Sequence, residues 1–159
     1  MGKGGVIIGI LGLLIAAGGL TLGLITFIDQ GKTDFWYDYK EATYTPPDLV
    51  HVTVPDLYVI VELDAPSILH ILFTTSVKIL PDPVSFADMI FYFWIDGVRL
   101  FDPFTRAGPY QGDATYQYYS VALQHSQVLG AGIHNISISV LSETAGNFMR
   151  SSCLAVNRY

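Results

Sequence analysis

The sequence is poor in cysteine and in positive charge, and each shortage excludes a class of protein. Cys153 is the only cysteine, so the chain forms no intrachain disulfide and offers no cluster of thiolates to a metal ion. Lysine and arginine together number 8 against 14 acidic residues, and the formal net charge is −6 at pH 7. Nucleic-acid binding needs a basic face that neutralises phosphates, so we expect no nucleic-acid partner.

The sequence also lacks the short motifs of common catalytic and nucleotide-binding sites. It contains no GxSxG, HExxH, GxGxxG or P-loop pattern. The 4 histidines stand without a second histidine, cysteine or acid at metal-ligand spacing, and we interpret them as structural: His51, His70, His125 and His134. We therefore predict a protein that is not an enzyme and holds no cofactor or metal, with a surface hydrolase as the remote alternative.

Several aspartates gather around predicted turns. Asp82 and Asp88, or Asp102 and Asp113, are conceivable calcium ligands because carboxylate oxygens suit that ion. Aspartate is also the residue that caps turns with its own side chain, and this is the interpretation we prefer.

One long uncharged run is present over residues 6–28. At about 1.5 Å per residue a helix of this length spans roughly 34 Å, slightly more than the ~30 Å hydrocarbon layer of a membrane. Lys3 precedes the run and Asp29 follows it, so the positive-inside rule places the N-terminus in the cytoplasm and the rest outside. We predict one long hydrophobic α-helix over residues 1–28 that anchors the chain in membrane lipid at a cell or virion surface.

Other interpretations of this segment stay open. Ile15 and Ala17 would make a poor signal-peptidase site, and the apolar run continues beyond it. Lys3-Gly4 before an apolar helix resembles the processing site of archaeal pilin-like precursors, although the acidic residue usual near the start of such helices is missing. Gly2 suggests myristoylation, but Val6 stands where that motif has serine or threonine.

Small residues recur in the segment at alternating spacings of four and three. They are Gly5, Gly9, Gly12, Ala16, Gly19, Gly23 and Thr26, and we call them the helix-assembly seam. A period of about 3.5 residues predicts a left-handed supercoil of parallel helices, and small side chains let helices approach closely in a bilayer. The segment is thus interpreted as an assembly device, in a membrane or in a filament core; the alternative is that glycine is simply frequent in membrane helices.

The rest of the chain reads as short strands separated by Gly, Pro and Asp turns. Expected strands cover residues 49–54, 57–63, 67–80, 89–95, 98–101, 115–129, 133–141 and 148–158, with an aromatic strand within the linker 29–48 and a loop over 102–113. Asp96-Gly97 is a strong hairpin signal. The pattern indicates an all-β head over residues 49–159, a single antiparallel, jelly-roll-like β-sandwich.

In two expected strands, the polarity of each face indicates whether that face is covered. In residues 133–141 the face with His134, Ile136, Ile138 and Val140 should be core, and the face with Asn135, Ser137 and Ser139 should point outward. MIFYFWI, residues 89–95, is apolar on both faces, so both should be covered. The core covers one side, and a second copy of the protein is the simplest cover for the other.

FYFWIDGVRL, YYSVALQHSQVLGAGIHNISISV and a final strand at the C-terminus resemble the C1q/TNF-like jelly rolls over about residues 49–159. The shared features are an aromatic strand, a DG hairpin and the pattern LxAGxHxIxI. The resemblance implies a compact homotrimer with both termini at one end, and many virion fibre and spike tips are similar. The LxAGxHxI strand is also similar to carbohydrate-binding sandwich modules, which keeps a glycan ligand open.

Two groups of residues remain as candidate sites. Asn135-Ile136-Ser137 is an N-glycosylation sequon. The aromatic residues Phe104, Tyr110, Tyr116, Tyr118 and Tyr119 suit either a subunit interface or a platform for sugar. We expect a self-assembling structural protein, a cell-surface, virion or filament subunit that displays its head and has copies of itself as partners; the alternative is a membrane-tethered module that binds a glycan or a receptor.

Overall fold

The computed structural model describes residues 34–81, 87–108 and 115–159, and this part of the chain contains strands but no helix. The helix, the helix-assembly seam and the anchor predicted for residues 1–28 lie outside the described residues. The chain separates into Met1–Asp34 and a compact unit, Phe35–Tyr159. No helix within the described ranges is long and apolar enough to cross a membrane.

The described residues form strands β1 to β8. They are β1 (Phe35–Lys40), β2 (Val52–Leu63), β3 (Ser67–Ile79), β4 (Met89–Ile95), β5 (Val98–Ala107), β6 (Gln117–Leu129), β7 (Gly132–Ser142) and β8 (Phe148–Arg158).

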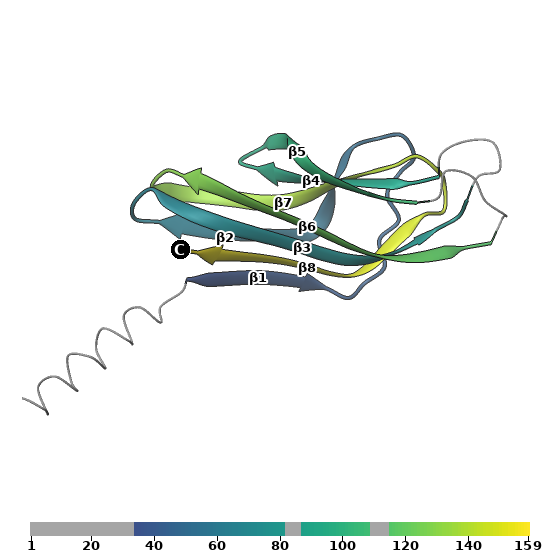
Figure 1. Ribbon diagram of the computed structural model, residues 1–159, viewed down its shortest axis with the longest axis horizontal. Helices are drawn as coiled ribbons and strands as arrows, with labels where there is room; N and C mark the ends of the chain where they lie inside the picture. Colours follow the sequence, from purple (N-terminus) through teal and green to yellow (C-terminus); the bar gives the residue numbers. More distant parts are fainter. Residues whose placement is uncertain (1–33, 82–86, 109–114) are drawn as a thin grey trace, which may run out of the picture. The chain divides into compact units, whose positions relative to one another are not determined.

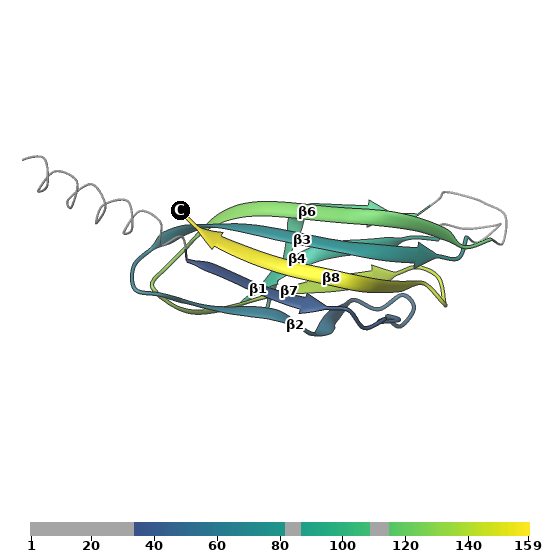
Figure 2. The ribbon, with the colours of Figure 1, turned by 90° about the horizontal axis from the view of Figure 1, so that it is seen from below.

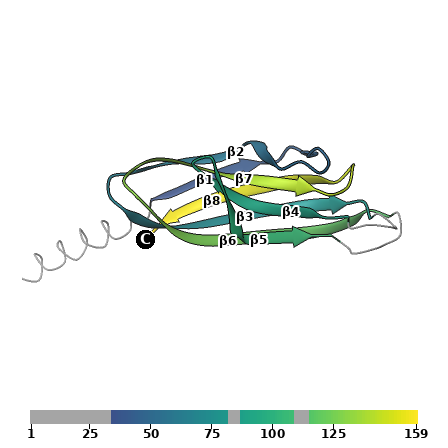
Figure 3. The ribbon, with the colours of Figure 1, turned by 90° about the horizontal axis from the view of Figure 1, so that it is seen from above.

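The strands build two antiparallel sheets that face each other. One sheet has the order β1-β8-β3-β6 and is in front in Figure 2, and the other has the order β2-β7-β4-β5 and is in front in Figure 3. Except for the hairpin between β4 and β5, each connection carries the chain from one sheet to the other. This arrangement is a jelly roll, so the predicted all-β antiparallel sandwich is confirmed.

The β4–β5 hairpin turns at the dipeptide that the sequence indicated. Asp96 and Gly97 have φ angles of 51° and 79°, the positive values that a tight two-residue hairpin turn requires. Ile95 and Val98 pair on either side of the turn.

Two strands run through prolines that were expected to end them. At Pro55 the chain forms a bulge, where the register between β2 and β7 shifts between Thr53 and Tyr58, so residues 49–54 and 57–63 are not two separate strands. Pro103 lies inside β5, where a loop was expected. Both β2 and β5 are edge strands, and an edge strand can lack an N–H donor on its free side without losing a ladder hydrogen bond.

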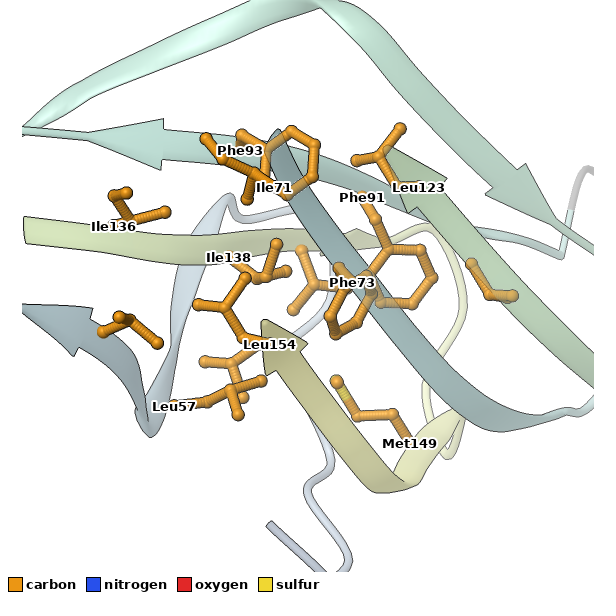
Figure 4. Packing of buried hydrophobic residues seen from close by; sticks show 14 of the residues in the cluster. Leu57, Ile71, Phe73, Phe91, Phe93, Leu123, Ile136, Ile138, Met149 and Leu154 are labelled. Atoms are coloured by element: carbon orange, nitrogen blue, oxygen red, sulfur yellow. The ribbon is translucent and has the colours of Figure 1, made fainter. Parts of the chain in front are cut away.

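The hydrophobic core fills the space between the sheets (Figure 4). The rings of Phe73 on β3 and Phe91 on β4 meet with centroids 5.5 Å apart, and both side chains are fully buried. Ile136, Ile138 and Val140 on β7 are also buried, as the alternation of that strand predicted.

The outward side of β4 is covered in part by the same chain. The ring of Tyr92 lies 5.4 Å from that of His51 and 5.8 Å from that of Phe104, centroid to centroid. Ser139, which was expected to face outward from β7, is fully buried between Thr53 and Tyr92 in the register. A second copy is therefore not required to cover β4, because its own neighbours supply apolar and aromatic contacts.

Candidate interaction surfaces

The outer face of the β1-β8-β3-β6 sheet is free of formal charge over its middle. Its paired rows are Phe35–Asn157–His70–Ser126, Tyr37–Ala155–Leu72–Gln124 and Tyr39–Cys153–Thr74–Ala122. On β3 and β8 these residues alternate with buried residues, and none of the twelve is Asp, Glu, Lys or Arg. We call these twelve residues the uncharged face.

The uncharged face has an aromatic margin and a centre of small side chains. On the edge strand β1, Phe35, Tyr37 and Tyr39 are 57%, 67% and 53% exposed. On the same sheet, across β8 from these rings, a shallow hollow of about 290 Å³ is lined by residues of β3, β6 and β8, among them Thr74, Ser76, Ser120, Ala122 and Ser151. Projecting rings and a hollow therefore occupy one surface.

Cys153 lies in the Tyr39 row of the uncharged face. Its side chain is half-buried, and burial, followed by the nearby charge of Asp38, raises the pKa of the thiol. A thiol with a raised pKa is a weak nucleophile at neutral pH.

The aromatic candidates for a subunit interface or a sugar platform do not all lie together among the described residues. The Lys78 ammonium sits over the ring of Tyr116, 3.8 Å from its centroid, and 5.5 Å from that of Tyr118. Tyr119 instead turns inward against the core, and its hydroxyl donates to Gln117 Oε1 over 2.5 Å. Phe104 belongs to the other sheet, and Tyr110 lies outside the described residues. Tyr116 and Tyr118 thus hold a cation of their own chain.

The outer face of the β2-β7-β4-β5 sheet carries charges and has a hollow of its own. A hollow of about 280 Å³ lies beside the β2 bulge, with Tyr58, Trp94, Asn135 and Ser137 among its lining residues. We call it the Trp94 hollow. Near it, the Arg99 guanidinium carbon lies 4.4 Å from the ring centroid of Phe101 and 5.3 Å from that of Tyr92.

A buried carboxylate lies at the end of the sandwich where β4 begins. Asp88 forms an ion pair with Arg106, whose Nη2 lies 3.7 Å from Glu143 Oε1. Burial raises the pKa of Asp88 to about 6; the hydrogen bond and charge of Glu143 add to this, and Arg106 acts against it. Asp88 is thus engaged by an arginine, and Asp102 lies on β5. Asp82 and Asp113, the other two calcium candidates, lie outside the described residues.

The described residues contain no group of three His, Cys, Asp or Glu side chains that could hold a metal ion. The histidines contact neighbouring protein groups instead. His70 Nδ1 lies 2.9 Å from Ser126 Oγ, the rings of His125 and Phe93 lie 6.3 Å apart, and His134 bonds both of its ring nitrogens.

The strand orders of the two sheets define the class of this domain as a jelly-roll β-sandwich. Among solved structures it is similar to the structure of Eiger TNF from S. frugiperda, with a TM-score of 0.50 and 10% sequence identity over 80% of this chain and 92% of that chain. The globular domain of zebrafish complement 1qA protein gives a TM-score of 0.49 at 10% identity, over 79% and 96% of the two chains. No family model and no curated protein sequence matches. The similarity to Eiger TNF supports a TNF-like jelly-roll fold and, at this identity, shows the fold alone.

Proposed function

We propose that this chain is a non-enzymatic display protein that associates with copies of itself through the uncharged face. Its N-terminal hydrophobic segment anchors it in a membrane or forms a filament core, and its sandwich is presented outside the cell or virion. The single observation that carries the proposal is the absence of formal charge across the rows of the uncharged face.

The contrast between the uncharged face and the opposite outer face supports this proposal, and the charges of its own sheet, Arg150 and Lys78, lie beyond the Tyr39 row. The β2-β7-β4-β5 sheet carries exposed Glu62 and Arg106 on its outer face, as expected for a surface that stays in water. Burying an unpaired charge is costly, so the centres of protein interfaces are depleted of charge and enriched in aromatic residues. The uncharged face has that composition although the chain as a whole is acidic.

A second copy is the occupant that fits best. The same surface supplies projecting rings at β1 and a hollow of small side chains between β3, β6 and β8, so one copy can insert its margin into the centre of the next. Such a head-to-tail contact closes into a ring or continues as a filament, depending on the rotation between copies. A homotrimer is the ring that the fold resemblance implies.

The ends of the sandwich suit this arrangement. Phe35 at the start of β1 pairs with Asn157 near the end of β8, so the chain enters the sandwich at the end where it also terminates (Figure 1). In a ring of copies related by rotation, every N-terminal segment would then join its sandwich at the same end.

Cys153, the only cysteine, reports directly on the uncharged face. The full-length protein would be extracted in mild detergent, its native mass measured, and the rate of maleimide labelling at Cys153 followed. We expect a multimeric mass and slow labelling. Ala122→Arg places a charge on an exposed position of this face and should speed labelling at least about tenfold, because an interface that buries an unpaired charge loses several kcal/mol.

Val98→Arg is the matched control, because Val98 is 63% exposed at the β4–β5 turn and lies outside the uncharged face. It should leave both mass and labelling unchanged. A monomeric native mass with equally fast labelling in all three proteins would overturn the proposal.

The helix-assembly seam is tested separately with the double variant Gly12→Leu and Gly19→Leu. Bulky side chains at the seam prevent close approach of helices, so the native mass should fall. If the seam variant keeps its mass and Ala122→Arg loses it, association is driven by the sandwich alone. If both variants assemble normally, neither surface is an interface.

A membrane-tethered binding module is the second candidate. Arg99 has no carboxylate partner among the described residues, and the aromatic side chains of Phe101 and Phe104 beside it are 68% and 54% exposed. Arginine held flat on aromatic rings is a common anchor for a partner. A monomeric wild-type protein that still adheres to cells, and loses adhesion with Arg99→Ala, would favour this function.

A further inference from the structure

Asn135 stands at the rim of the Trp94 hollow with its side chain exposed. On this face Tyr58, Ser137 and Trp94 form one row of paired residues, and Ile60 and Asn135 form the next. Asn135 is therefore a diagonal neighbour of both aromatic residues, a separation of about 7–8 Å that a bulky group can bridge.

The backbone of Asn135 is fixed, but its side chain is not engaged. Its N–H donates to Asp96 Oδ1 over 2.8 Å, and its carbonyl accepts from the Asp96 N–H over 2.9 Å. Within the described part of the chain its carboxamide makes no hydrogen bond. The strand is thus held in place, while the exposed carboxamide lies beside the hollow without a partner among the described residues.

Exposed apolar side chains lie around Asn135. Ile60 is 55% exposed, Ile133 is 71% exposed and Tyr58 is 49% exposed. A pyranose ring matches such a site, because its C–H face packs on aromatic and aliphatic groups while its hydroxyls hydrogen-bond to polar rim groups such as Thr53 and Ser137.

We propose that Asn135 carries an N-linked saccharide whose first ring lies in the Trp94 hollow. This rests on the extracytoplasmic placement of the sandwich in the proposed function. The donor class is a saccharide linked through diphosphate to a lipid. The Asn135 amide nitrogen bonds to the anomeric carbon, the anomeric C–O bond breaks, the lipid diphosphate leaves with the electron pair, and one amide proton passes to a base.

The test is the mass of the tryptic peptide 107–150 from full-length protein made in a cell that N-glycosylates exported proteins. We expect a saccharide at Asn135 and its loss in both Asn135→Gln and Ser137→Ala. Asn147 lies in the same peptide but in no sequon, so it should stay unmodified.

Glu41→Asn supplies the matched control, because it creates the sequon Asn-Ala-Thr in an exposed segment before β2. Modification at position 41 without modification at Asn135 would overturn this inference and leave the display proposal standing. Modification at neither position would show that the sandwich is not exported, which would overturn the extracytoplasmic placement and this inference with it.

The position of the first sugar is tested by enzymatic removal of part or all of the saccharide. Treatment with an endoglycosidase that leaves only the first sugar should leave the melting temperature of the protein unchanged. Treatment with an amidase that removes the whole saccharide should lower the melting temperature by an amount on the order of 3 °C relative to the trimmed form. The amidase product is matched by Asn135→Asp. This drop in melting temperature should be smaller in Trp94→Leu and in Tyr58→Ser. An equal drop in wild type and in both variants would overturn the placement of the first sugar in the Trp94 hollow.

Discussion

His134 Nδ1 lies 2.7 Å from Asp96 Oδ2, while His134 Nε2 lies 2.9 Å from the carbonyl oxygen of Gly130. A carboxylate and a carbonyl both accept hydrogen bonds, so both ring nitrogens must donate, which only the protonated imidazolium can do. The hydrogen bond to Asp96, followed by that to Gly130, raises the pKa of His134. One side chain thus joins the β4–β5 turn to the β6–β7 turn.

This geometry gives stability a pH dependence. Because the folded pKa of His134 is raised above the unfolded value of about 6.5, its contribution is complete below pH 6.5 and is lost as the pH rises through the folded pKa. We expect His134→Gln to lower the free energy of unfolding by about 1–2 kcal/mol at pH 5.5 and by less at pH 8.5. Urea unfolding at the two pH values checks this, and an equal loss at both would show that the imidazolium is not required.

Asp88 should act in a lower pH window. Its folded pKa of about 6 exceeds an unfolded value of about 3.9, so the folded state binds the proton more tightly and stability falls as the pH rises from about 4 to 6. We expect Asp88→Asn to flatten the melting temperature between pH 4.5 and 7.

The control for Asp88 is Asp64, an exposed carboxylate that accepts a hydrogen bond from Arg158 over 2.8 Å. That hydrogen bond lowers the pKa of Asp64, so its contribution has the opposite sign and is lost on acidification. Asp64→Asn should leave the Asp88 window unchanged. If the wild type shows no dependence on pH over this range, Asp88 is not the group that titrates.

Asn147 pins the turn between β7 and β8. It is fully buried, its Oδ1 accepts from the Leu80 N–H over 2.9 Å, and its Nδ2 donates to Ser142 Oγ over 3.2 Å. Asn147→Ala leaves the Leu80 donor unsatisfied, so we expect a loss of about 2 kcal/mol in the free energy of unfolding, against less than ~0.5 kcal/mol for exposed Glu62→Ala. Urea denaturation measures the free energy of unfolding of both variants. Similar losses in the two would show that Asn147 does not stabilise the turn.

Phe73 and Phe101 test where the energetic core lies. Phe73 is fully buried between the sheets, whereas Phe101 is 68% exposed on β5. We expect Phe73→Ala to cost about 3–5 kcal/mol through lost contacts and a cavity, and Phe101→Ala less than about 1 kcal/mol. Unfolding by denaturant decides between them, and comparable losses would mean that Phe101 packs in a way that its exposure does not reveal.

Alternation of apolar residues predicted much of the sandwich, because a strand with one buried face must repeat with a period of two. It placed Ile136, Ile138 and Val140 of β7 in the core correctly, although it put buried Ser139 on the outward face. The dipeptide Asp96-Gly97 located the hairpin. The pattern failed at Pro55 and Pro103, where a proline looks like a strand end. Whether proline ends a strand depends on whether its missing N–H would have met a neighbour, and the sequence does not say which strands are edges.

The aromatic candidates are divided between the sheets for a related reason. Tyr116, Tyr118 and Phe104 are close in the sequence, but β5 and β6 belong to different sheets. Lys78 reaches Tyr116 and Tyr118 only because β3 pairs with β6, and Arg99 reaches Tyr92 only through the β4–β5 hairpin. Contacts between strands depend on which strands pair and in which register, and nothing in the sequence indicated either.

By itself the sequence determined most of the strands, most of the residues that they turn inward, the acidic charge and the apolar character of residues 6–28, because these are properties of local composition and period. Only the tertiary structure decided that Tyr37, Ala155, Leu72 and Gln124 form one row of an uncharged face. Each residue points outward for local reasons, but a shared surface arises from strand order, which nonlocal packing sets. The same order placed Asn135 beside Trp94.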